Sequence, residues 1–151
     1  MPVILTAVIE GVTLVSATPE TLLHVGAGVK IRVHEWGVSF DGVTASDAPV
    51  EVQLLTQSTV GTASSGTPVA RDRSATLTPA SDFHHTFTVE PTLGAVLESH
   101  LITPNGGLLV MQYMPGSEPV TAGGSTEFIG LKATAPTSNV SANAWIAYSE
   151  E

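Results

Sequence analysis

The sequence contains no cysteine and few basic residues, and both absences exclude classes of protein. Without cysteine there is no disulfide framework and no thiolate metal site. Five lysine and arginine residues stand against 14 acidic residues, which gives a net charge of −9. The five cations are scattered along the chain, at Lys30, Arg32, Arg71, Arg73 and Lys132. The basic footprint of a nucleic-acid-binding protein is therefore missing, and the acidic surface repels anionic membranes. We expect neither nucleic acid nor a membrane as a partner.

Long apolar runs are also missing. No run approaches the roughly 20 residues that a membrane helix needs. Residues 1–9 are apolar, but no basic region precedes them, Glu10 interrupts them, and no small-residue cleavage site follows. We therefore expect no signal peptide and synthesis in the cytoplasm. Charged residues form only 13% of the chain, a composition poorly suited to exposed helices.

What the sequence does contain is typical of a β protein. The 151 residues, 42% of them hydrophobic, are enough for one domain with its own core. The clearest strand spans residues 29–40, where apolar residues alternate with polar ones but change phase halfway. One extra residue near His34 and Glu35, a β-bulge, reconciles the two halves.

The rest of the chain reads as short strands between turns. Further strands are expected in the following ranges: 50–56, 85–89, 95–103, 108–113, 128–133 and 140–148, with weaker candidates at 69–73 and 76–78. Residues 61–66, rich in serine, threonine and glycine, and residues 120–124 are expected to be loops. The nearly continuous apolar run at 108–113 predicts a central strand or one buried on both faces. In the last strand, Val140, Ala142, Ala144, Ile146 and Tyr148 share one face. About eight strands predict a single all-β sandwich, most naturally an eight-stranded jelly roll.

The N-terminal residues 1–20 allow two interpretations, with residues 21–151 forming the sandwich in either case. They form an extended arm that pairs with an edge strand of this domain or of a neighbour, or they are an ordinary first strand. If they are an arm, deleting residues 2–17 leaves the sandwich folded and removes an intersubunit contact. The candidate interface residues are Pro2, Val3, Ile4, Leu5, Val8 and Ile9.

No catalytic motif is present in the sequence. There is no Gly-x-Ser-x-Gly elbow and no phosphate-binding loop ending in Gly-Lys-Ser/Thr. Among the histidines, Asp82 and His84 could share a metal ion, whereas adjacent His84 and His85 point to opposite faces of a strand. Two ligands fall short of the four that structural zinc requires. We therefore expect no catalytic residue, no metal and no cofactor, and a protein that acts by binding.

Several further candidates depend on geometry. Paired carboxylates for glycoside hydrolysis would come from Glu35, Glu51, Glu90, Glu98 and Glu127. A calcium site would use Asp41 and Asp47, although no EF-hand spacing appears. The large aromatic residues Trp36, Trp145, Tyr113 and Tyr148 either stack on a sugar or pack in the core. These residues leave open two alternatives: a carbohydrate- or receptor-binding jelly roll, and a β-sandwich hydrolase or cupin-like metalloenzyme.

The strand pattern resembles small β-sandwich virion proteins of tailed bacteriophages, and most closely capsid decoration, or cement, proteins. The resemblance is carried by residues 33–42, residues 49–55, and residues 133–145 with the closing Glu150 and Glu151, and extends over residues 20–151 as strand pattern and composition. It implies a non-enzymatic protein of the virion that binds the major capsid protein, commonly as a homotrimer. It carries over no catalytic residue. It also implies that the carbohydrate- or receptor-binding alternative would be a module of a phage tail.

Overall fold

The computed structural model describes residues 2–26, 28–41, 48–74, 76–122 and 126–151. In these ranges the chain forms strands and no helix, and nothing helical is available to span a membrane. The strands are β1 (Leu5–Leu14), β2 (Pro19–Gly26), β3 (Ile31–Phe40), β4 (Val50–Gln57), β5 (Thr62–Gly66), β6 (Val69–Ala70), β7 (Asp82–Val89), β8 (Leu93–Ile102), β9 (Leu108–Gln112), β10 (Phe128–Thr134) and β11 (Val140–Glu150).

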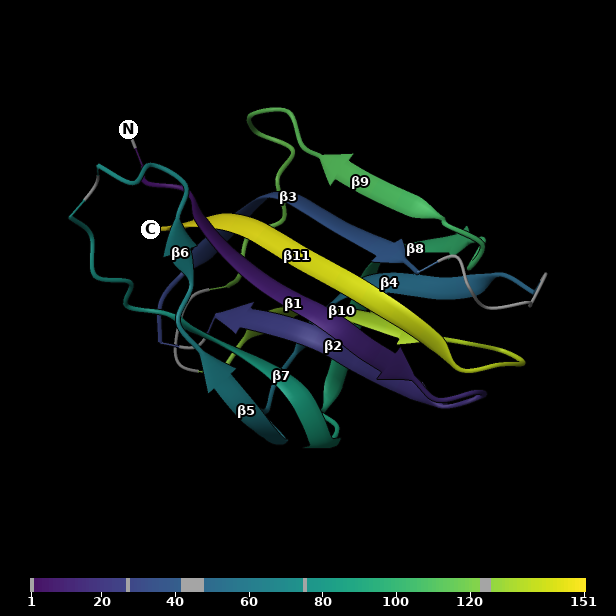
Figure 1. Cartoon of the computed structure of the whole chain (residues 1–151). Helices are drawn as coiled ribbons and strands as arrows, with labels where there is room; N and C mark the ends of the chain where they lie inside the picture. The colour runs from purple at the N-terminus through teal and green to yellow at the C-terminus, as the bar shows by residue number, and fades with distance from the viewer. Residues whose placement is uncertain (1, 27, 42–47, 75, 123–125) are drawn as a thin grey trace.

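The strands form two antiparallel sheets, as Figure 1 shows. The five-stranded sheet has the order β6-β1-β11-β3-β9, and the six-stranded sheet has the order β5-β7-β2-β10-β4-β8. From β1 to β4 the chain changes sheet at every connection, and it does so again from β8 to β11. The predicted all-β sandwich is confirmed.

The described residues form eleven strands instead of the expected eight. β7 covers the strand expected at 85–89, whereas β2 and the short edge strands β5 and β6 were not among the clear predictions. The prediction of a loop at residues 61–66 was wrong, since Thr62–Gly66 pairs with β7 as an edge strand. Its polar residues have no strand periodicity, so the pairing partner imposes the extended conformation. Of the two weak candidates, residues 69–73 supply only the two residues of β6, and residues 76–78 form no strand.

The core lies between the two sheets and is built from the inward-facing residues of each strand. The expected face of β11 is buried throughout, with Val140, Ala142, Ala144, Ile146 and Tyr148 all at 2% exposure or less. Trp36 and Tyr148 are fully buried, so these two aromatic residues pack in the core. Such burial is the main favourable contribution to folding.

The predicted bulge in β3 is confirmed. Pairing with β11 shifts register so that Glu35 lies opposite Ala147 while Val33 lies opposite Tyr148, which leaves His34 as the extra residue. The His34 ring contacts Ser149 Oγ at 2.9 Å and lies 3.8 Å from a Glu118 carboxylate oxygen. The bulge therefore lets both halves of β3 bury their apolar residues on the same side.

The N-terminal segment lies within the domain. β1 pairs with β11 from Leu5 opposite Tyr148 to Leu14 opposite Val140, and its first two residues also pair with β6. Leu5, Ala7 and Leu14 are fully buried in the core. Leu5–Leu14 is thus a strand of the domain's own sheet, and β2 already begins at Pro19, before residue 21.

Candidate functional site

Strands β8 and β9 expose an aliphatic surface at the open edges of both sheets. β8 is an edge strand of the six-stranded sheet, and β9 is an edge strand of the five-stranded sheet. Figure 1 shows both on the side of the sandwich away from β5 and β6. Leu101 is 72% exposed, Leu108 62% and Met114 79%. Leu101 lies on the outer face of the six-stranded sheet, and Val110 lies on the outer face of the five-stranded sheet. We call the exposed apolar residues of these two edge strands, together with Met114, the β8–β9 edge: Leu93, Val96, Leu97, Leu101, Leu108, Val110 and Met114.

The expectation that residues 108–113 form a central or doubly buried strand was wrong. β9 pairs with β3 on one side only. Leu109 and Met111 are half-buried against the core, while Leu108 and Val110 face solvent. A continuous apolar run normally means burial on both faces. Here the second face is free in the single chain, which is the pattern expected of a surface that another molecule covers.

The residues of the β8–β9 edge are themselves uncharged, although Glu51 of the neighbouring β4 lies opposite Leu101 and accepts a hydrogen bond from Ser99. β9 contains no charged residue, and the one acidic residue of β8, Glu98, is turned toward the space between the strands. There its carboxylate accepts a hydrogen bond of 2.5 Å from the Tyr113 hydroxyl and lies 3.4 Å from His100 Nε2. In a chain of net charge −9, the uncharged aliphatic side chains of the β8–β9 edge are well suited to contact with another protein.

Tyr113 fastens this edge to the core. Its hydroxyl accepts a hydrogen bond of 2.9 Å from Trp36 Nε1 and donates to Glu98. Burial, and then the neighbouring Glu98 carboxylate, raise the pKa of Tyr113 above its usual range. The phenol therefore stays protonated and keeps donating, which ties β8, β9 and the buried indole together.

We expect Tyr113→Phe to lower the free energy of unfolding by about 1–3 kcal/mol, because it leaves the Trp36 N–H and the Glu98 carboxylate without their shared partner. Urea denaturation at pH 7 measures the difference. Met114→Ala, which removes a side chain that is 79% exposed next to Tyr113, is the control and should change stability less. Equal stability of Tyr113→Phe and the wild type would contradict this role.

The outer face of the five-stranded sheet carries a second group of interacting side chains. The indole of Trp145 on β11 lies across Gly37 of β3. Glu35 accepts hydrogen bonds from Trp145 Nε1 at 3.0 Å, from Arg71 Nη2 at 2.6 Å and from Gln112 Nε2 at 2.7 Å. The bond from Arg71, aided by the other two against the effect of burial, lowers the pKa of Glu35 to about 2. This carboxylate is ionised at every physiological pH and holds three strands and a loop in place.

The structure separates the predicted N-terminal interface residues. Pro2 and Val8 are exposed, Val3, Ile4 and Ile9 are half-buried, and Leu5 is fully buried. Leu5 is in the core and takes no part in an outward contact. Val8 faces outward beside Trp145, the residue opposite it on β11.

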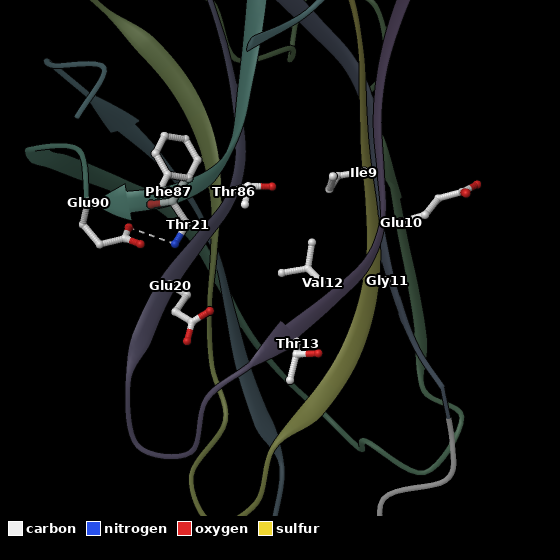
Figure 2. A pocket seen from close by; sticks show the side chains of 10 residues that line it. All are labelled: Ile9, Glu10, Gly11, Val12, Thr13, Glu20, Thr21, Thr86, Phe87 and Glu90. Atoms are coloured by element: carbon white, nitrogen blue, oxygen red, sulfur yellow. Dashed lines mark hydrogen bonds between the residues drawn. The ribbon is translucent and has the colours of Figure 1, made fainter. Parts of the chain in front are cut away.

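Figure 2 shows a polar hollow of about 270 Å³ between β1 and the strands β2 and β7. Ile9 and Val12 point into it, whereas Glu10 points away. Glu90 accepts a hydrogen bond from the Thr21 N–H, and Glu20 accepts one from the Val15 N–H. Both carboxylates thus accept hydrogen bonds from backbone N–H groups.

The remaining carboxylates also bind separate partners. Glu51 accepts from Gln53 and Ser99, Glu98 from Tyr113, and Glu127 from the Ala122 N–H. In the part of the chain that the structure describes, no three histidine, aspartate or glutamate side chains are placed to hold a metal. Asp47, one of the two residues considered for calcium, lies outside the described residues.

Two histidines from different strands are in contact, the buried His24 of β2 and the half-buried His84 of β7. His24 is fully buried on β2, with Nε2 3.2 Å from His84 Nδ1 and Nδ1 2.7 Å from Gln57 Oε1. Its ring stacks on Phe128 at a centroid distance of 4.1 Å. Sequence reasoning missed this cluster because its members come from four strands.

Comparison of the chain with models of protein families, with curated proteins and with solved structures gave no match. The site is therefore interpreted from its own geometry. Two outward surfaces remain as candidates for binding: the β8–β9 edge and the face around Trp145.

Proposed function

We propose that this protein is a non-enzymatic binding module with a jelly-roll fold, enlarged by β5, β6 and β7. Without these three strands, the sheets have the orders β1-β11-β3-β9 and β2-β10-β4-β8. Eight strands divided between two sheets, with the first and last strands adjacent, support the jelly-roll assignment. Viral capsid proteins and lectins are among the proteins built on this fold.

Within that class, the proposed protein is a capsid decoration protein of a tailed phage. It is made in the host cytoplasm, incorporated in the virion, and bound to the major capsid protein as a homotrimer. The resemblance described from residues 20–151 supports the virion assignment. The observation that carries the binding role is the exposed, uncharged β8–β9 edge.

The physical properties of this edge suit attachment to a shell. An edge strand offers unpaired backbone N–H and C=O groups, and its leucine side chains gain free energy when a partner removes them from water. A decoration protein binds many equivalent positions, and linked copies in a trimer bind together. Modest contacts at each copy then give stable attachment. The carboxylate network around Glu35 and the Tyr113 bonds keep the surface rigid before it binds.

Co-sedimentation with assembled shells tests this function. The probe is the major capsid protein whose gene lies nearest to that of this chain, assembled into empty shells. The double variant Leu101→Asp with Leu108→Asp places two negative charges on the β8–β9 edge. We expect it to bind the shells at least tenfold more weakly, because two apolar side chains are no longer buried and two charges would have to be desolvated in the contact. Light scattering of the unbound wild type is expected to give three times the chain mass.

Val89→Asp is the matched control, since Val89 is 57% exposed on β7, away from this edge. It should bind the shells like the wild type. Circular dichroism and a thermal melt check that each variant is folded. A wild-type protein that stays in the supernatant contradicts the virion role, and a double variant that still sediments contradicts the role of the edge.

A further inference from the structure

The Trp145 indole forms a flat aromatic surface on the outer face of the five-stranded sheet. A Cβ atom placed on Gly37 would lie 2.1 Å from Cζ2 of the indole, so only glycine lets the ring lie against β3. Trp145 is half-buried, whereas its inward neighbours Ala144 and Ile146 are fully buried. Its cross-strand neighbour Val8 and the Gly37 partner Val110 are both exposed. The sheet thus presents the ring between two aliphatic side chains.

The orientation of this ring is fixed before any ligand arrives. Trp145 Nε1 and Arg71 Nη2 donate to the same oxygen of Glu35, and Arg71 Nε donates to Thr6 Oγ1 at 3.0 Å. A ring held in this way loses little conformational entropy on binding. A half-buried indole N–H could donate its hydrogen bond to water. The bonds of Trp145 and Arg71 to Glu35 are therefore not needed to satisfy the indole, and they fix the direction of the ring.

A hollow begins beside this ring, on the side of β1 and β6. Its volume is about 350 Å³, and its lining includes Val8, Val69, Arg71 and Arg73. Arg71 is neutralised by Glu35. Arg73 forms no ion pair with any residue in the ranges that the structure describes. An uncompensated cation in a chain of net charge −9 favours an anionic ligand at this place.

We propose that this face binds an acidic oligosaccharide. One pyranose ring stacks its C–H face on the Trp145 indole, the chain crosses Val8, and a sugar carboxylate lies beside Arg73. Aromatic side chains with one open face and a nearby polar rim are suited to such amphipathic ligands. A carboxylate can accept two hydrogen bonds from one guanidinium, which gives the arginine end its selectivity.

An acidic peptide fits this surface less well. Peptides commonly bind a sandwich by adding a strand to a free edge. Beside the hollow, the edge strand β6 has only two residues, and β1 beyond it is interrupted by a bulge between Ile9 and Val12, so neither offers a long regular edge. The site lies toward β1 and β6, whereas β9 lies on the opposite side of β11 and β3. Val110 borders both surfaces, whereas Arg73 lies only at the hollow and Leu101 only on β8. Variants at Arg73 and Leu101 therefore separate glycan binding from attachment through the β8–β9 edge.

The test is a titration of the full chain with two soluble oligosaccharides of equal length, one built from uronic acids and the other neutral. Calorimetry and tryptophan fluorescence measure the binding. We expect the wild type to bind the acidic oligomer at least tenfold more tightly than the neutral one. Trp145→Ala should lose both, while Trp145→Phe should keep part of the affinity. Arg73→Gln should bind the two oligomers equally.

Leu101→Ser, on β8, is the matched control and should bind like the wild type. Arg73→Gln should also keep shell binding, so failure of this site is distinct from failure of the decoration role. Wild-type protein that binds neither oligomer overturns the proposal. Equal affinity of Trp145→Ala and the wild type, or binding of an oligoglutamate peptide in place of the sugar, also overturns it.

Discussion

A chain that lacks residues 2–14 is expected not to fold. β1 supplies Leu5, Ala7 and Leu14 to the core, and all three are fully buried. It also covers one side of β11, with which it pairs along most of its length. Deletion would expose that side of β11 and open the core along the five-stranded sheet. The two buried leucines alone contribute about 4–10 kcal/mol, which is comparable to the whole 5–15 kcal/mol by which a typical domain is stable, and the pairing with β11 is lost as well.

Point variants make the same comparison without removing the strand. Leu14→Ala should lower the free energy of unfolding by about 2–5 kcal/mol, and Val8→Ala should change it by less than about 0.5 kcal/mol because Val8 is exposed. Urea denaturation measures both. A folded, cooperative truncated chain would show instead that β1 is dispensable.

The position of β1 inside the five-stranded sheet changes the interpretation of the predicted N-terminal interface residues. The expectation that deletion of residues 2–17 leaves the sandwich folded follows only from a detached arm. In the structure, those residues include all of β1, and loss of shell binding in that truncation would report unfolding. The surface variants Leu101→Asp and Leu108→Asp avoid this ambiguity, because neither side chain belongs to the core.

Stability is expected to fall by about 3 kcal/mol between pH 6.5 and pH 4. Burial lowers the pKa of His24 from 6.5 to about 4, the Gln57 hydrogen bond opposes this, and His84 adds to it. Burial likewise lowers the pKa of His84, with Asp82 opposing and His85 adding. In the unfolded chain His24 binds a proton near pH 6.5, whereas in the folded chain it stays neutral down to about pH 4. One pKa unit corresponds to about 1.36 kcal/mol, so this contribution is present above pH 6.5 and is lost as the pH falls to 4.

Urea denaturation at pH 7, 6, 5, 4.5 and 4 measures this dependence. His24→Phe keeps an aromatic ring against Phe128 and removes the titrating group, so its stability should vary less over this range even if it is lower throughout. His100→Gln is the control, since His100 lies on β8 at the opposite edge of the same sheet, and it should follow the wild type. Wild-type stability that is constant from pH 7 to pH 4.5 would contradict the role of His24.

The sequence predicted the parts of the fold that depend on local pattern. Alternating apolar residues identified β3, β4 and β11, and the change of phase in β3 located the bulge at His34. The pattern failed at Thr62–Gly66, where the polar residues become a strand because β7 lies beside them. It also failed to distinguish the core position of Trp36 from the outer position of Trp145.

By itself, then, the sequence determined that the protein is an all-β sandwich without cysteine chemistry, since periodicity and composition act within a few residues. The tertiary structure decided which apolar residues remain outside. β9 reads as a buried strand, yet its place at the end of a sheet leaves Leu108 and Val110 exposed. It also decided that Glu35, Arg71 and Trp145 meet, because their contacts join residues far apart in the chain. Burial and proximity are properties of the whole packed chain, and the candidate binding surfaces consist of both.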